Sequence, residues 1–452
     1  MPIWLRTLPQ KSLVCLVLAF LPFCGASATW AQTGTEHTAE PARPPRDLVL
    51  SGKLPDQPSQ PPAFSIPVEP LGFVAPGAIY LGQRATTVSL DFLDENHILF
   101  TFRVPGLLRR EAGASPDSDE HQIRAVVVAL PAGTVSAEAL WTLHDRVRYL
   151  WMLKDGHFLL RDGNDLQEGD ATLVLKPRLQ FPGPLFWLEI DPTQQFLVTD
   201  SREPAATQAK PGQVGVPATA SASMTVDGQD PPVPPSQPDL VVRILHFKSG
   251  QVLLVSRVRS TVHLPINSQG YLEGLRGRGL EWVLNLNYFT GGSLTLGHFD
   301  STCAPTFDFV SEQVILATGC DASGTRTIEA MTTAGKRLWQ DLTSPQSIWP
   351  VLVMAPNGSR IASETLAVSH AVNAYAPIYS DDVKGQLVRI LDAATGKVAL
   401  EAPASPVLDA GGNVAISPSG RRVAVLNAGA LQVFDLPAPP PVSETAPKPH
   451  TP

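Results

Sequence analysis

Short apolar runs alternate with tight polar turns over most of this chain, and one unit recurs throughout. Each unit has a β-rich apolar strand, three or four turn residues drawn from Pro, Asp, Asn, Ser and Gly, and a second β-rich strand. These turn residues accept the backbone angles of a tight reversal, so each unit predicts a hairpin. The hairpin turns end at Ile98, Phe158, Phe196, Tyr271, Val314, Ile361 and Val423.

A second kind of hairpin follows several of these units. It is written IRAVVVALPAGTVSAEALWTL, VVRILHFKSGQVLLVS, TIEAMTTAGKRLWQDL and LVRILDAATGKVALEA. Two hairpins make four antiparallel strands, which is one blade of a β-propeller. The 372 positions from 65 to 436, without the 36 of an insertion at 202–237, divide into seven units of 48. The predicted fold class is therefore all-β, a propeller of seven four-stranded blades. Six or eight blades stay open, because the insertion interrupts one repeat.

The last unit is short by one strand. After AISPSGRRVAV, only LQVFDLP precedes a proline-rich tail. The apolar segment AFSIPVEPLGFVAPGAIYLG, near the start of the repeat region, is expected to supply the missing strand. Such a strand would close the ring and cover an otherwise exposed sheet edge.

Residues 1–31 have the order of a secretory signal peptide: basic residues, an apolar run of twelve positions, then small residues. The run is shorter than the roughly twenty residues that span a bilayer as a helix. Cleavage is expected after Ala28 or after Ala31. A lipoprotein signal would use Cys24, but Phe23 stands where such signals carry a small residue.

The predicted organisation has four parts. Prolines remove backbone donors, and the residues around them bury little apolar area, so proline-rich stretches are expected to be disordered. The parts are a signal peptide at 1–31, a disordered segment at 32–64, a propeller at 65–436 with a disordered insertion at 202–237, and a tail at 437–452.

The net charge and the cysteines restrict the class of partner and the cellular location that the sequence predicts. Loss of the leader removes Arg6 and Lys11 and moves the formal net charge from −8 to −10, which argues against a nucleic-acid partner. No second apolar stretch has membrane length, so a periplasmic or extracellular location is expected. Cys303 and Cys320 are the cysteines that remain, and the strand-turn-strand segment between them predicts a disulfide.

The repeat motifs resemble those of known propellers. SPSGRRVAV and APNGSRIAS look like turns of YVTN-type and WD-repeat propellers, while DAATGKVALEA and TTAGKRLWQ resemble quinoprotein-like repeats. In the quinoprotein pattern a tryptophan packs between blades, as the resemblance implies for Trp141 and Trp339. Leu400 stands where another such tryptophan is expected. No cofactor is therefore expected.

Candidate chemistry is sparse. The histidines of the predicted propeller are scattered without zinc-binding spacing, so no metal site is expected; they are His97, His121, His144, His157, His246, His263, His298 and His370. The stretch DGNDLQEGD has Leu166 where a calcium ligand is needed, and a polar hairpin loop is expected there.

No catalytic residue is predicted either. FTGGSLTLG has Thr295 in place of the last glycine of a nucleophile elbow, and no phosphate loop occurs. One carboxylate per blade could still converge at the central channel, as in propeller lactonases and glycosidases, because such a site has no local signature.

The resulting interpretation is an exported, non-catalytic binding or protein-interaction module. Its partner would be a protein or small ligand at one face or in the channel. The alternative is a hydrolase or lyase with a polar channel site, and a third hypothesis is a quinone- or calcium-dependent enzyme.

Overall fold

A computed structural model describes residues 48–49, 53–76, 85–106, 120–145, 147–203, 239–258, 262–372 and 378–440. They belong to one compact unit that begins at Pro45. The predicted signal peptide and nearly all of the insertion and tail lie outside the described residues. Within the described ranges no helix is long and apolar enough to cross a bilayer.

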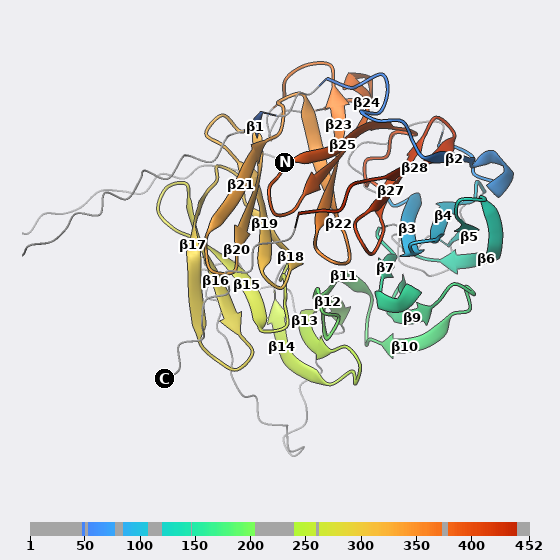
Figure 1. Ribbon diagram of the computed structural model, residues 1–452. Helices are drawn as coiled ribbons and strands as arrows, with labels where there is room; N and C mark the ends of the chain where they lie inside the picture. Colours follow the sequence, from blue (N-terminus) through green and yellow to red (C-terminus); the bar gives the residue numbers. More distant parts are fainter. Residues whose placement is uncertain are drawn as a thin grey trace, which may run out of the picture. The chain divides into compact units, whose positions relative to one another are not determined.

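Seven antiparallel sheets succeed one another around a ring (Figure 1). The first is β3 (Val88–Asp94), β4 (His97–Arg103), β5 (His121–Ala129) and β6 (Thr134–Leu143); the second is β7 (Leu150–Met152), β8 (Phe158–Asp162), β9 (Asp165–Gly169) and β10 (Lys176–Gln180). The third is β11 (Leu185–Ile190), β12 (Phe196–Glu203), β13 (Asp239–His246) and β14 (Val252–Val258); the fourth is β15 (Gly270–Arg276), β16 (Glu281–Tyr288) and β17 (Ser293–Asp300).

The ring continues with blades 5 to 7. The fifth is β18 (Thr306–Ser311), β19 (Val314–Cys320), β20 (Arg326–Thr332) and β21 (Arg337–Leu342); the sixth is β22 (Ser347–Met354), β23 (Arg360–Val368), β24 (Val383–Asp392) and β25 (Val398–Ala404). The seventh is β26 (Val414–Ile416), β27 (Arg422–Asn427), β28 (Ala430–Asp435) and β2 (Phe64–Pro67). Helical structure in the described residues is limited to the 3-10 turns η1 (Glu69–Leu71), η2 (Lys154–Gly156) and η3 (Ser380–Asp382).

The predicted seven-bladed propeller is confirmed, with two departures from uniform four-stranded sheets. Six of the seven hairpin anchors are the first or second residue of the second strand in their blade, and Tyr271 is the second residue of β15, the first regular strand of blade 4. Blade 4 has three regular strands, and its anchor Tyr271 pairs with Asn287 of β16 on one side and forms an isolated bridge with Ile266 on the other. Blade 5 gains a fifth strand, β1 (Leu48–Val49), which pairs in parallel with β21.

The N-terminal segment supplies the closing strand, as predicted. Antiparallel pairing joins β2 to β28, and Ile66 lies opposite Leu431. Ile66 is 5% exposed and shares a core with Val433 of blade 7 and Phe100 of blade 1. The strand therefore fills the seam between the last blade and the first.

Part of the segment expected to be disordered lies on the ring. The Ser59 amide donates to the Glu401 carbonyl at 2.7 Å, and the Glu401 amide donates to Ser59 Oγ at 3.0 Å. A proline-rich strip needs only a few such bonds to follow a surface, because proline itself requires no donor partner. Composition alone does not predict these hydrogen bonds between the proline-rich segment and blade 6.

Tryptophans and a disulfide fasten neighbouring elements. Trp339 is 5% exposed, and its Nε1 donates to the carbonyl of Ala393 in blade 6 at 2.7 Å. Trp141 packs on Phe158 of blade 2, with ring centroids 5.7 Å apart. The disulfide between Cys303 and Cys320 is present in the structure.

A buried carboxyl ties blade 6 to blade 7. Glu364 on β23 is 1% exposed and accepts hydrogen bonds from the Gln386 amide at 2.5 Å and the Gly412 backbone at 3.2 Å. Burial raises the pKa of Glu364 to about 7, although these donors act in the opposite direction.

The raised pKa of Glu364 predicts a loss of stability with rising pH. The folded chain holds this proton more tightly than the unfolded chain, so its contribution is present at low pH. It is lost as pH rises from the unfolded value of 4.5 through about 7. We expect the free energy of unfolding to fall by up to about 3 kcal/mol over this window from this group. Urea unfolding at several pH values should show that Glu364→Gln removes this component, whereas the exposed Glu281→Gln keeps it. An unchanged profile in Glu364→Gln would contradict the assignment.

Candidate functional site

The first strands of the blades face the centre of the ring. Figure 1 shows β3, β7, β11, β18 and β22 nearest the centre, and β3 contacts both β26 and β7 around it. In blade 4 this position belongs to the irregular stretch that contains His263 and Pro265. Because proline has no N–H to donate, this stretch pairs with β15 only in part: the Leu272 amide donates to the Pro265 carbonyl.

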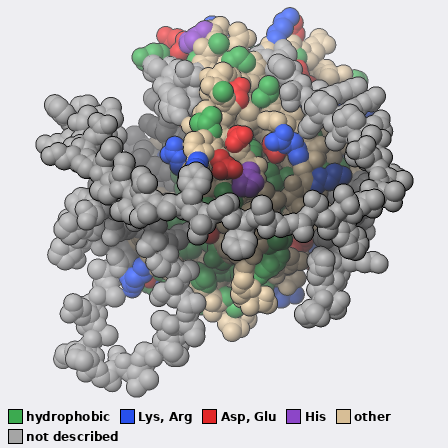
Figure 2. All heavy atoms as spheres, turned by 90° about the vertical axis from the view of Figure 1, so that its left-hand side faces the viewer, with side chains coloured by type: hydrophobic (Ala, Val, Ile, Leu, Met, Phe, Trp, Pro, Cys, Tyr) green, Lys and Arg blue, Asp and Glu red, His purple; other side chains and the backbone are tan. Residues whose placement is uncertain are grey.

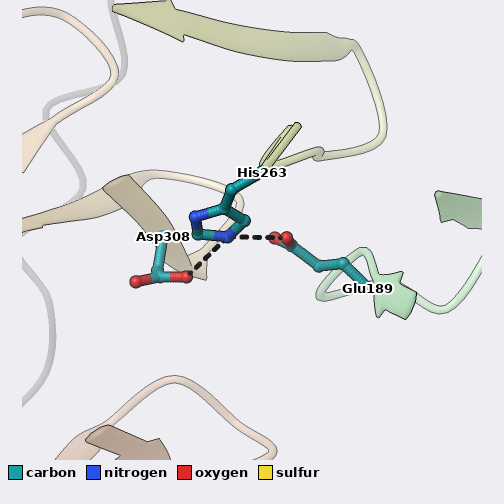
Figure 3. Close-up of side chains that lie close together, drawn as sticks. All are labelled: Glu189, His263 and Asp308. Atoms are coloured by element: carbon teal, nitrogen blue, oxygen red, sulfur yellow. Dashed lines mark ion pairs between the residues drawn. The ribbon is translucent and has the colours of Figure 1, made fainter. Parts of the chain in front are cut away.

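Three side chains from consecutive blades meet at the centre. His263 Nε2 lies 3.0 Å from Glu189 Oε2 on β11 and 3.4 Å from Asp308 Oδ1 on β18. Figure 3 shows the imidazole between the two carboxylates, with the same nitrogen directed at both. The three side chains are 17 to 29% exposed, so they are neither in the core nor fully in solvent. We call Glu189, His263 and Asp308 the channel triad.

Electrostatics in the channel triad depend on its two acids. Burial alone would lower the pKa of His263, but the neighbouring Asp308 and Glu189 outweigh it and raise that pKa to about 10. Burial raises the pKa of Glu189, and the charge of Asp308 adds to that effect, while His263 opposes it. His263 is therefore a cation at neutral pH when nothing else is bound between the acids.

Two further charged groups point into the same region. The Arg148 guanidinium, just before β7, is affected most by desolvation, which lowers its pKa, and then by the charges of Asp91 and Glu189, which raise it. Asp91 lies on β3 and accepts a hydrogen bond from Ser89 Oγ at 2.6 Å. Arg148 lies over the Trp151 ring at 5.1 Å. Charged side chains from five successive blades are thus linked by their electrostatic interactions.

An aromatic side chain borders the channel triad. Trp187 lies two residues before Glu189 on β11, and side chains at this spacing share one face of a strand. Its ring is edge-on to His263, with centroids 4.8 Å apart, and the residue is 37% exposed. A half-exposed indole beside charged groups is a common component of small-molecule sites.

A cavity of about 320 Å³ opens at the turns that follow these inner strands. Its lining includes Pro192 after β11, Glu312 after β18, and Asn357 after β22. Glu312 also accepts hydrogen bonds from the backbone and hydroxyl of Ser268 in blade 4. The cavity therefore lies only a few residues along the same strands from Glu189 and Asp308.

The side of the molecule drawn in Figure 2 has a different character. Figure 2 shows acidic and basic side chains of the described residues close to one another, with apolar side chains between them. Mixed charge of this kind does not select a ligand by sign.

Most residues considered in the sequence have local partners. His97 pairs with Asp94, and His298 pairs with Glu281 on an exposed surface. Asp162 and Asp165 flank the turn between β8 and β9, as expected for a polar hairpin loop. Among the scattered histidines, His263 is the one that the fold places between two acids from other blades.

The acids on the inner strands, Asp91, Glu189 and Asp308, lie at similar positions in their repeats, a signal that was not used in predicting the site. Asp91 and Glu189 each lie seven positions before the hairpin anchor of their blade, and Asp308 lies six before its anchor. An acidic residue at matching repeat positions on inner strands marks the channel wall. His263 has no comparable signal, because blade 4 is irregular there.

Comparisons with known proteins assign no function to the channel triad, so its role is argued from its geometry. No protein-family model matches the sequence, and no curated protein matches it. The chain is similar to the WD40 domain of Toxoplasma gondii coronin, at 9% identity and a TM-score of 0.42, over 87% of this chain and 89% of that one. The chain is also similar to the β-propeller domain of the Trilobed protease from Pyrococcus furiosus, at 9% identity and a TM-score of 0.42, over 78% of this chain and 94% of that one. A third similar structure is Pyrococcus horikoshii acylaminoacyl peptidase, at 12% identity and a TM-score of 0.42, over 77% of this chain and 51% of that one. This chain therefore spans about half that peptidase's length.

Proposed function

We propose that this protein is an exported propeller that binds a small polar ligand in its central channel. The observation that carries the proposal is the convergence of Glu189, His263 and Asp308 from three consecutive blades. Side chains so far apart in sequence meet only through the ring, and desolvated charges are costly unless they are paired or bind a ligand. Arg148 and Trp187 add a cation and an aromatic surface to the same space.

Native mass spectrometry of protein isolated from its own envelope tests this proposal. We expect a small-molecule mass on the wild type and its loss from the double variant Glu189→Gln, Asp308→Asn. Each lost charged hydrogen bond is worth roughly 1.5–3 kcal/mol, so binding should weaken by at least about tenfold. The matched control is Glu281→Gln, which alters an exposed acid–histidine pair and should keep the bound mass.

Two outcomes would replace the proposal. A reproducible protein partner without a bound small molecule would move the function to the outer surface. Turnover of a chromogenic glycoside or ester by the wild type, lost in Glu189→Gln, would favour the hydrolase alternative. One observation supports that alternative, since an acid with a raised pKa beside a second carboxylate suits general acid catalysis.

A further inference from the structure

We propose that the channel triad is a binding site for one divalent transition-metal ion, of which Zn²⁺ is the best-matched example. The ligands are the carboxylates of Glu189 and Asp308 and Nε2 of His263. This inference rests on the proposed function and deepens it, because the metal would present its remaining coordination positions to the channel ligand.

The distances in the triad suit a common metal centre. Zinc binds histidine nitrogen and carboxylate oxygen at about 2.0–2.2 Å, so neighbouring ligands of a tetrahedral ion lie about 3.3–3.6 Å apart. The nitrogen–oxygen distances are 3.0 and 3.4 Å, and all three donor atoms lie within 4.8 Å of one another. A small movement of the Glu189 or Asp308 side chain would complete the arrangement.

Hydrogen bonding within the triad is incomplete without such an ion. Figure 3 shows both acids on one nitrogen of His263, and one N–H cannot serve two acceptors well. His263 Nε2 and Glu189 Oε2 are both shielded from solvent, and beyond the ion pairs of the triad neither makes a hydrogen bond of acceptable geometry within the described chain. A metal ion would satisfy the nitrogen and both carboxylates at once.

Charge and donor type select the ion. With a neutral imidazole, the two carboxylates of Glu189 and Asp308, bound as anions, balance the two positive charges of a divalent cation. Imidazole favours zinc and its transition-metal neighbours, whereas calcium and magnesium prefer oxygen ligands alone. Three protein ligands with a further open position are the pattern of zinc sites that also bind a substrate or water.

Isothermal titration of the EDTA-stripped full chain with ZnCl₂ tests the site. We expect one Zn²⁺ per chain and an affinity at least about 100-fold lower in His263→Asn, since loss of an outer-shell partner alone costs 10–100-fold. The matched control is His298→Asn, which removes an exposed histidine from a similar acid pair and should bind as the wild type does. Thermal melting of each variant checks its fold.

Wild-type affinity in His263→Asn, an equal loss in His298→Asn, or no zinc binding by the wild type would overturn the proposal. If His263→Asn does not fold, diffraction from the zinc-soaked wild type decides. An anomalous peak between the three triad residues supports the site, and its absence overturns it. A wild type that binds no zinc but keeps its small-molecule mass removes the metal site alone. A wild type that binds neither zinc nor a small molecule removes the proposed function as well.

Discussion

Ile66→Asp should lower the free energy of unfolding by about 4 kcal/mol or more. Ile66 is the buried residue of the closing strand β2, and Ile→Asp removes its apolar contacts while placing an unpaired charge in the seam. Its side chain also lies against the turn at Gly133 in blade 1, so both sides of the seam are affected. Urea unfolding followed by circular dichroism measures the change.

Ser65 provides the control on the same strand. It is exposed, and successive side chains of a strand point to opposite faces. Ser65→Asp should change stability by no more than about 0.5 kcal/mol. Equal losses in the two variants, or a negligible loss in Ile66→Asp, would mean that β2 does not close the ring in solution.

Replacement of Trp339 by alanine should cost about 3–5 kcal/mol. The indole fills the space between blades 5 and 6 and donates to the Ala393 carbonyl. The turn at Gly396 lies on its ring, where a Cβ would come within 2.7 Å of the indole. Trp339→Phe keeps most of the packing and should lose only about 1–2 kcal/mol, mainly for the missing donor.

Trp187→Ala is the control for Trp339→Ala. Trp187 is 37% exposed, so Trp187→Ala should cost less than about 1 kcal/mol while weakening ligand binding in the channel. Melting curves of the three tryptophan variants measure these differences. A Trp339→Ala protein as stable as Trp187→Ala would contradict the proposed joint between blades.

Much of the fold follows from local sequence. The strand-turn-strand pattern located every hairpin anchor, from Ile98 to Val423, because period-two apolar patterning and turn chemistry act over a few residues. The shortage of one strand after Val423 predicted the closure by residues near Phe64. Pro265 explains the incomplete inner strand of blade 4.

The channel triad could not be predicted from the strand-turn-strand pattern. Its members lie 74 and 45 residues apart, and their meeting depends on how three blades are placed around the ring. A spacing argument for metal ligands looks along the chain, so it grouped His263 with the scattered histidines. The periodic acids at Asp91 and Glu189 could have indicated the channel wall, but not which histidine faces it.

A crystal structure of the protein isolated from its source cells tests the central claim most directly. We predict additional electron density in the channel, in contact with Glu189, His263 or Asp308 and extending towards Trp187. A channel that contains only water, with a ligand or partner bound elsewhere on the ring, would contradict it.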